Sequence, residues 1–326
     1  MAVVAPDGRL LSSVGDPERL TYLRSSAKPF QLVPFVASGR FDTYDFGNPT
    51  EAMAIMAASH SGEDRHVRTV QALLRQGGLS RDVLQCGTHP PFDTETAQRL
   101  LRDGEPLTPL RHNCSGKHAG FALHAKAAGW DIETYWQPAH PTQQLALEVI
   151  STLTDVPVGD VATATDGCGV VTFGVPLRAL GLAFARLADP SEVSDKPTRA
   201  ALERIRDAMI AHPELVGGER RRFDTALMRA VPGAVVAKGG AEGVQGLGVL
   251  AGKAQAVEDG ALGLALKIED GDFARRAGST VTCAALRNLG VLDGGASAQL
   301  ADYASPPIRD PRGDPAGEVM AILALS

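Results

Sequence analysis

The sequence lacks the features that mark secreted disulfide scaffolds, membrane proteins and nucleic-acid-binding proteins. Only four cysteines occur in 326 residues, and they lie far apart without a Cys-x-x-Cys pair. Acidic residues outnumber basic ones by 38 to 32, so there is no basic excess to neutralise phosphates. No run reaches the ~20 apolar residues of a membrane span, and the N-terminus has neither a basic nor a long apolar leader. We therefore expect a soluble cytoplasmic protein with reduced thiols and with neither nucleic-acid nor membrane partners.

The composition is that of an ordinary globular protein. Hydrophobic residues make up 44% of the chain and charged residues 21%, a balance that argues against intrinsic disorder. A chain of this length buries enough apolar surface to hold a rigid site without disulfide or metal cross-links. We found no internal repeat and no low-complexity tract. A self-sufficient folded core is therefore expected.

Hydrophobic periodicity divides the chain into strand-forming ends and a helical middle. Apolar runs at 2–4 and 9–14 flank a Pro-Asp-Gly turn, which predicts a β-hairpin. Spacing of three to four residues predicts helices at 28–38, 50–58, 65–75, 94–102, 116–128, 142–154, 177–187, 198–211 and 219–229. Gly-rich apolar runs later in the chain predict strands at 234–237, 246–251, 260–268 and 318–325, with a helix at 272–289. The segments 189–197 and 305–315 are expected to be surface loops.

Strands at both ends of the chain imply that the two ends meet in one sheet, because exposed strand edges are rarely left unpaired. The predicted class is α+β, with a mainly antiparallel sheet flanked by helices. We expect residues 1–326 to form one unit, in which 1–25 and 230–326 make the sheet and 26–229 make a helix-rich middle.

A Ser-x-x-Lys pattern, Ser25 to Lys28, stands at the start of a predicted helix. Spacing of three residues puts the hydroxyl and the amine on one helix face. A serine becomes nucleophilic when a neighbour accepts its proton, and a partly desolvated lysine can do this. An isolated Ser-x-x-Lys is far more often a helix cap followed by a solvated lysine, so the pattern alone is weak.

Two further segments strengthen the pattern. A polar cluster at 59–66 begins with Ser59 directly after an apolar helix, where sites are commonly built, although helix capping explains much of it. Lys238 and two glycines follow a predicted strand, much as a Lys-Thr-Gly element sits opposite Ser-x-x-Lys in serine β-lactamases and penicillin-binding proteins. The co-occurrence of the three segments in this order favours a catalytic interpretation over three separate structural ones.

Cysteine and histidine gather in a third set of segments. Residues 113–118 read Asn-Cys-Ser-Gly-Lys-His, and residues 165–169 read Thr-Asp-Gly-Cys-Gly. Two cysteines and a histidine suit zinc, but the spacing lacks the usual paired-cysteine signature. Cys114 could instead be a nucleophile whose thiolate is favoured by the helix start, or simply a buried structural thiol.

Taken together, these segments resemble the rhizobial-type (class 3) L-asparaginase II family, whose members are similar in fold to glutaminases and serine β-lactamases. The resemblance is carried by residues 24–29, 58–61, 86–90, 113–118 and 165–168, and it covers nearly the whole chain. It implies an L-asparagine amidohydrolase and favours a homodimer. Members of that family usually carry a segment with an acidic residue and a histidine before the first strand, so a sheet-edge element is expected to be missing here.

The resemblance also implies roles for individual residues. Ser25 would attack the side-chain amide with Lys28 as base, giving an aspartyl ester that water cleaves, while Ser59 and Lys238 form a second Ser-Lys tandem. Arg24 and Asp166 would bind the α-carboxylate and α-ammonium groups of L-asparagine. A zinc ion near the site, assisting substrate binding more than catalysis, would be held by Cys114, Lys117 and Cys168.

Three alternatives remain open from the residues themselves. A penicillin-recognising or esterase-like serine acyl hydrolase needs only the Ser-x-x-Lys and Lys-x-Gly elements and leaves residues 113–118 unexplained. A non-catalytic sensor of a metal or an amino acid would keep the fold with an inert serine. A cysteine enzyme would use Cys114 as nucleophile and would retain activity in Ser25→Ala.

Overall fold

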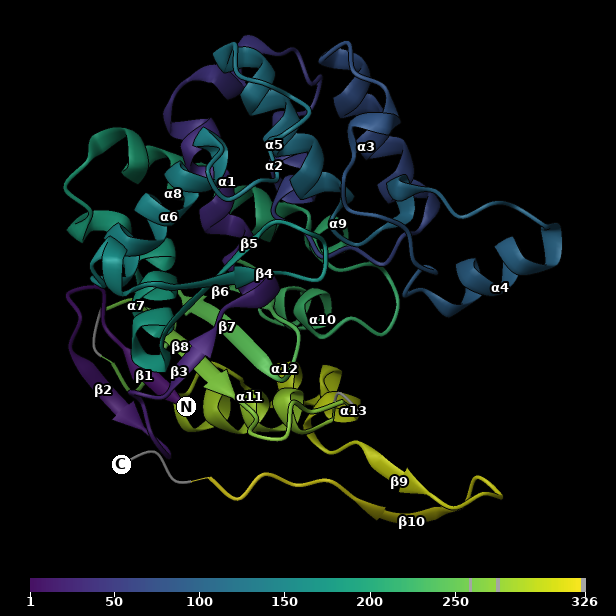
Figure 1. The fold of residues 1–326 in the computed structure, drawn as a ribbon. Helices are drawn as coiled ribbons and strands as arrows, with labels where there is room; N and C mark the ends of the chain where they lie inside the picture. The colour runs from purple at the N-terminus through teal and green to yellow at the C-terminus, as the bar shows by residue number, and fades with distance from the viewer. Residues whose placement is uncertain (258–259, 274–275, 324–326) are drawn as a thin grey trace. The chain divides into compact units, whose positions relative to one another are not determined.

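The computed structural model describes residues 1–257, 260–273 and 276–323, and its fold is the predicted α+β class (Figure 1). Contacts divide the chain into two compact units. One comprises Met1–Ser26, Val175–Glu192 and Ala226–Ser326, and the other comprises Ala27–Gly174 and Val193–Thr225. We call them the sheet unit and the helical unit.

The sheet unit contains a five-stranded antiparallel sheet with the strand order β2-β1-β8-β7-β6. Its strands are β1 (Ala2–Val4), β2 (Leu10–Ser13), β6 (Val235–Gly239), β7 (Val244–Val249) and β8 (Leu262–Lys267). The N-terminal strand β1 pairs with β8 in register Ala2 to Ala265, so the two ends of the chain share one sheet. The predicted hairpin and the predicted joining of the terminal segments are both confirmed.

Helix α7 (Leu177–Ala188) lies against β8, β7 and β1 in the sheet unit (Figure 1). Glycines let the helix and strand backbones approach: a Cβ on Gly263 would lie 1.9 Å from the carbonyl oxygen of Gly181, and one on Gly181 would lie 2.9 Å from Val4. The Gly-rich composition of these strands therefore serves close helix-on-sheet packing rather than turns alone. Helix α11 (Ala277–Asn288) also contacts β7 and β8.

The helical unit is built on two helices that are buried almost all round. Nine of the ten residues of α1 (Lys28–Ala37) and most of α5 (Ser115–Ala128) are buried, and the buried residues include the polar Lys28 and Lys117. The other helices that lie wholly in this unit are α2 (Pro49–Met56), α3 (Asp64–Gln76), α4 (Thr94–Asp103), α6 (Pro141–Thr154), α8 (Lys196–Ala211) and α9 (Pro213–Val216). Polar side chains cap several of these helices; Asp93, for example, accepts a hydrogen bond from the Thr96 amide. The starts of α1 and α5 have no such side-chain cap bond, and these two starts carry Lys28 and Cys114.

Several sequence-based boundaries were wrong. The helix expected at 219–229 is α10 (Phe223–Ala230), because residues 219–222 use their polar groups in a loop described below. The helix expected from 272 begins at 277, after a segment whose residues 274 and 275 lie outside the described part. The strand expected at 318–325 is wrong as far as it is described: β10 (Pro315–Glu318) pairs instead with β9 (Pro307–Arg309), which falls within a predicted loop.

The remaining elements are short. They are β3 (Leu20–Tyr22), β4 (Ala162–Thr165), β5 (Val171–Pro176), α12 (Gly294–Gln299) and α13 (Ala301–Ala304). Strands β4 and β5, which were not predicted, pair antiparallel around a turn that contains Asp166 and Cys168. Within residues 1–257, 260–273 and 276–323, no helix has the length and hydrophobicity required to cross a bilayer.

Candidate active site

Lys28 is fully buried at the first turn of α1, and its ammonium nitrogen has three neutral acceptors. The Nζ donates to the carbonyl oxygen of Ala58 at 2.6 Å, to Ser59 Oγ at 2.9 Å and to the carbonyl oxygen of Asn113 at 3.2 Å. Burial lowers the pKa of Lys28, although the neighbouring Cys114 thiol acts in the opposite direction. Burial therefore makes the neutral amine, the form that can accept a proton, easier to reach.

Ser59 lies in the loop after α2, beyond Ala57 and Ala58, and is buried. Its amide donates to the carbonyl oxygen of Val216 at 3.0 Å, and its own carbonyl oxygen accepts from Arg222 Nη2 at 2.7 Å. With its hydroxyl on Lys28, the residue is held through three polar groups at once. The family resemblance pairs Ser59 with Lys238, and the contact of Ser59 with Lys28 was not predicted.

Ser25 lies half-buried in the sheet unit, in the 3₁₀ turn Arg24–Ala27 that precedes α1. The preceding residue, Arg24, has φ +51°, a left-handed conformation that is uncommon for a residue with a side chain and costs roughly 1 kcal/mol or more. The Arg24 guanidinium also forms an ion pair with Glu242. The hydroxyl of the neighbouring Ser26 is already used in a hydrogen bond, which it donates to the carbonyl oxygen of Leu23 at 2.6 Å.

Lys238 belongs to the sheet unit, where it stands near the end of β6. Its side chain is almost completely buried, and Nζ donates to the carbonyl oxygen of Gly239 at 2.6 Å. Strand β6 is at the edge of the five-stranded sheet, and a buried lysine there requires hydrogen bonds for its polar end. The strand predicted before Lys238 is confirmed, and it extends through the lysine to Gly239.

Cys114, Lys117 and Cys168 are brought together in the helical unit. Lys117 Nζ lies 3.1 Å from Cys168 Sγ, and the two thiols share a hydrogen bond. That bond, together with the nearby lysines and against the effect of burial, holds the pKa of Cys114 well below its usual value; the same bond raises the pKa of Cys168. Burial opposes the charge on Lys117, but the two thiols outweigh burial and raise its pKa. One thiolate and one ammonium are the favoured charges of this cluster.

The donor chemistry of this cluster suits a soft cation such as zinc, which takes thiolate and nitrogen ligands. Two sulfurs and one lysine nitrogen are present, and Lys117 would have to release its proton before its nitrogen could coordinate. Among residues 1–257, 260–273 and 276–323, no three His, Cys, Asp or Glu side chains are placed to share a metal ion. The cluster therefore fits zinc only if the lysine nitrogen serves as the third ligand, as the family resemblance implies.

Asp166 is half-buried in the turn between β4 and β5. Its amide donates to the carbonyl oxygen of Val170 at 2.8 Å, and Gly169 returns a bond to the Asp166 carbonyl at 2.8 Å with φ +90°, a conformation that favours glycine. The Cys168 thiol lies 3.6 Å from the Asp166 carboxylate. The turn therefore places a carboxylate next to the thiol cluster.

The polar cluster at 59–66 contains two neutral histidines with defined tautomers. Gly62 donates its amide to His60 Nδ1 at 3.1 Å, so His60 Nε2 carries the proton and faces Ser115 Oγ at 2.9 Å. Glu63 likewise donates to His66 Nδ1 at 3.1 Å, while His66 Nε2 bonds the carbonyl oxygen of Glu214 at 2.9 Å. Burial lowers the pKa of both rings, that of His66 to about 4. These residues act as structural acceptors and donors at neutral pH.

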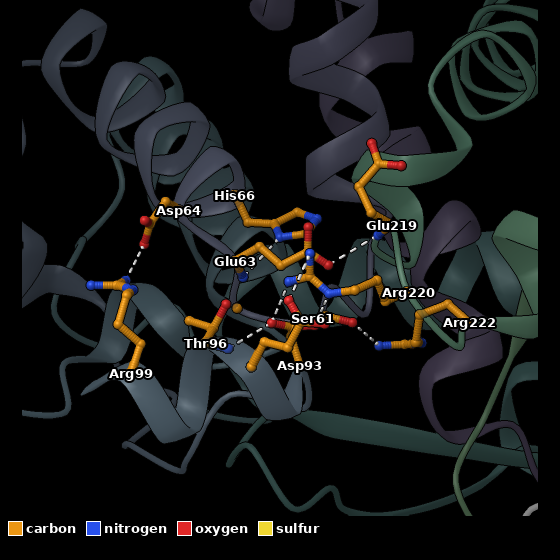
Figure 2. Close-up of polar contacts among 12 residues, drawn as sticks. Ser61, Glu63, Asp64, His66, Asp93, Thr96, Arg99, Glu219, Arg220 and Arg222 are labelled. Carbon is orange, nitrogen blue, oxygen red and sulfur yellow. Dashed lines mark hydrogen bonds and ion pairs between the residues drawn. The ribbon is translucent and has the colours of Figure 1, made fainter. Parts of the chain in front are cut away.

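Sequence reasoning missed the arginines that hold this loop, which Figure 2 shows converging on Ser61 and Asp93. Arg222 donates to Ser61 Oγ at 3.0 Å, and Arg220 grips both carboxylate oxygens of Asp93 at 2.8 and 2.6 Å. The run of three arginines after two glycines at 217–222 was a visible signal, but it was assigned to a helix start.

An α+β chain in which a buried lysine is hydrogen-bonded to a serine hydroxyl has the elements of a serine hydrolase. The family model described as L-asparaginase II matches residues 1–321, and the chain belongs to this family. A comparison with curated protein sequences returned no match.

Family membership confirms the resemblance seen in the sequence and the class of enzyme it implies. The protein is an asparaginase-type amidohydrolase, a hydrolase that acts on amide carbon–nitrogen bonds of a small-molecule substrate.

Proposed function

We propose that the protein hydrolyses L-asparagine to L-aspartate and ammonia, with Ser25 as nucleophile and Lys28 as the base three residues later. The observation that carries the proposal is the environment of Lys28, a fully buried amine surrounded by a hydroxyl and two carbonyl oxygens. Such an amine is suited to accept a proton and return it.

In the acylation step, Ser25 Oγ attacks the side-chain carbonyl carbon and its proton moves to Lys28 Nζ. When the carbon–nitrogen bond breaks, Lys28 returns that proton to the departing nitrogen, which leaves as ammonia. Water then attacks the aspartyl ester and gives its proton to Lys28. The ester carbon–oxygen bond breaks, Ser25 Oγ takes the proton back, and L-aspartate is released. Lysine is regenerated as the neutral amine after each half of the cycle.

Ser59 and Lys238 are proposed as the second Ser-Lys tandem. Ser59 supports this role through its hydrogen bond to Lys28, because the hydroxyl can stabilise the amine or relay a proton. Arg24 and Asp166 are the proposed partners of the substrate's α-carboxylate and α-ammonium groups. Cys114, Lys117 and Cys168 would hold zinc, which when bound would supply a fixed positive charge that assists substrate binding.

The experiment that tests this function measures ammonia release from L-asparagine and L-glutamine by wild type, Ser25→Ala and Ser26→Ala. We expect turnover of L-asparagine to disappear in Ser25→Ala and to persist in Ser26→Ala, whose hydroxyl is already committed to Leu23. One methylene distinguishes the two substrates, which is worth only about 1 to 3 kcal/mol in an apolar pocket.

Two outcomes would contradict the proposal. Retained turnover in Ser25→Ala together with lost turnover in Cys114→Ala would assign the nucleophile to the thiol. Failure of wild type to release ammonia from L-asparagine, with or without added zinc, would favour a different acyl substrate or a sensor.

A further inference from the structure

The loop that carries Ser59 is fastened on one side by a single segment, residues 216–222. Ser59 donates its amide to the carbonyl oxygen of Val216 at 3.0 Å, and the Ser61 hydroxyl donates to the carbonyl oxygen of Gly217 at 3.0 Å. Glu219 donates its amide to Glu63 Oε1 at 3.0 Å. Ser59, Ser61 and Glu63 of the loop therefore each have a hydrogen-bond partner in residues 216–222.

Close approach of the two segments requires glycine. Gly218 has φ +141°, and a Cβ there would lie 2.5 Å from Ser61 Oγ and 2.8 Å from Glu63 Oε1. Cβ atoms in proteins essentially never lie this close to another atom. The backbone at position 218 can therefore approach the loop this closely only because the residue is glycine. The fastening is thus a built feature of the fold rather than a chance surface contact.

We propose that Arg222 is a positioning residue that fixes the Ser59 hydroxyl on Lys28. One guanidinium nitrogen donates to the Ser59 carbonyl oxygen at 2.7 Å, and the other donates to Ser61 Oγ at 3.0 Å. The two bonds straddle His60, so the rigid guanidinium holds the loop at two points. This inference rests on the proposed role of Ser59.

The rest of the Ser59 environment cannot replace this guanidinium. The Ser59 amide donates to Val216 and its hydroxyl accepts from Lys28, while its carbonyl oxygen accepts from Arg222. Loss of Arg222 would leave that buried carbonyl without its charge-assisted bond, and the loop would relax by rotating about Ser59. Because a displacement of about 1 Å at a catalytic group can cost about 100-fold in rate, a small rotation is sufficient to impair turnover.

Arg220 provides a matched control. It stands two residues earlier in the same loop and donates to both carboxylate oxygens of Asp93 (Figure 2). Its ion pairs are with Asp93 and Glu95, and not with Ser59. An alanine at either position removes one arginine from one cluster. Only the Arg222 substitution removes a bond to Ser59.

The test compares kcat, KM and the thermal midpoint of Arg222→Ala, Arg222→Lys, Arg220→Ala and Ser59→Ala with wild type. For Arg222→Ala we expect kcat to fall by about 100-fold while KM changes less than about 3-fold, and we expect guanidinium at non-denaturing concentrations to restore part of the loss. In Arg222→Lys, kcat should fall about 10-fold, because a single ammonium group does not reproduce the paired hydrogen bonds that the guanidinium makes to Ser59 and Ser61. Arg220→Ala should lower the thermal midpoint and leave kcat close to wild type.

The Lys variant keeps the inference testable if Arg222→Ala does not fold. A kcat within twofold of wild type in Arg222→Lys or Arg222→Ala would overturn the inference, as would an equal fall in kcat for Arg220→Ala and Arg222→Ala. If Ser59→Ala is as active as wild type, the proposed role of Ser59 fails and the inference fails with it. If Ser59→Ala is inactive while both Arg222 variants turn over normally, only the inference is wrong.

Discussion

Two buried lysines of the helical unit, Lys28 in α1 and Lys117 in α5, differ in the direction of their pKa shifts. Both are removed from solvent and both lie near Cys114. Burial dominates at Lys28 and lowers its pKa, whereas the thiol pair dominates at Lys117 and raises its pKa. Both lysines interact with Cys114, and the difference lies in their other acceptors. Lys28 also donates to a hydroxyl and two carbonyl oxygens, whereas Lys117 lies 3.1 Å from the second thiol, Cys168.

The comparison separates two roles that the residue type alone does not distinguish. A buried amine whose pKa is lowered mainly by burial releases its proton more readily and can then accept one from a nucleophile. A buried ammonium next to a thiolate is part of an ion pair, and its removal leaves an uncompensated charge. Lys28 should therefore affect turnover more than stability, and Lys117 should affect stability more than turnover.

The largest effect is expected from Lys28→Met. Methionine fills a similar volume without a base, so kcat should fall by about 1,000-fold. The free energy of unfolding should fall by only about 1 to 3 kcal/mol, because the carbonyl oxygens of Ala58 and Asn113 lose their donor. Steady-state kinetics and denaturant unfolding of the same preparation check both statements. A loss of stability with turnover preserved within tenfold would reverse the comparison.

Lys117→Met should have the opposite pattern. Removing the ammonium leaves the Cys114–Cys168 pair without its charge partner, which should cost about 3 kcal/mol of stability, with a decrease in kcat of about tenfold or less. Urea unfolding at constant pH measures the first quantity and ammonia release the second. A decrease in kcat as large as that of Lys28→Met would show that both lysines act in the proton transfers.

The architecture was largely readable from the sequence because periodicity and glycine placement are local signals. The joining of strands 2–4 and 260–268 followed from their position at opposite ends of a helical chain, and β1 and β8 do pair. The helix expected at 219–229 begins only at Phe223, for a physical reason. The polar groups of residues 219–222 bond to segments more than 120 residues earlier in the chain, as Arg220 with Asp93 shows. Local propensity contains no information about such partners.

The sequence predicted which residues belong to the candidate site, but it did not predict which of them contact one another. The Ser-x-x-Lys spacing identified Lys28, yet its contact with Ser59 joins positions 31 residues apart and depends on how α1 and α2 pack. Cys114, Lys117 and Cys168 were grouped through family resemblance, and their proximity in the helical unit is a finding of the structure. The direction of each pKa shift required knowledge of burial and neighbours, which no spacing rule supplies.

A pH experiment extends the comparison to His66, another buried base whose pKa is lowered mainly by burial. Its folded-state pKa of about 4 lies below the ordinary value of 6.5, mainly because of burial, so the unfolded chain binds more protons between these pH values. Stability should therefore be complete above pH 6.5 and decline as the pH falls toward 4. Linkage predicts a loss of about 2 kcal/mol between pH 7 and pH 5 from this residue.

The variant His66→Gln isolates the contribution of His66 to the pH dependence of stability. Its amide can bond to both Glu63 and Glu214 without titrating. Other buried histidines titrate in the same range, so the variant should show a shallower decline rather than a flat profile. An unchanged difference in unfolding free energy between pH 7 and pH 5 would mean that His66 is charged in the folded protein.

The smallest expected effect tests the zinc proposal. If zinc is held by Cys114, Lys117 and Cys168 and mainly assists substrate binding, chelation followed by dialysis should raise KM by about tenfold and leave kcat nearly unchanged. Metal content by mass spectrometry should fall from one zinc per chain to none, and Cys114→Ser should lack the metal from the outset.

The raised pKa of Lys117 provides a second test of the zinc proposal. Zinc must displace a proton from an ammonium that the thiols stabilise, so the ion pair competes with coordination. Zinc uptake should therefore release protons into a weakly buffered solution and strengthen as the pH rises, whereas uptake without proton release would exclude coordination by the Lys117 nitrogen.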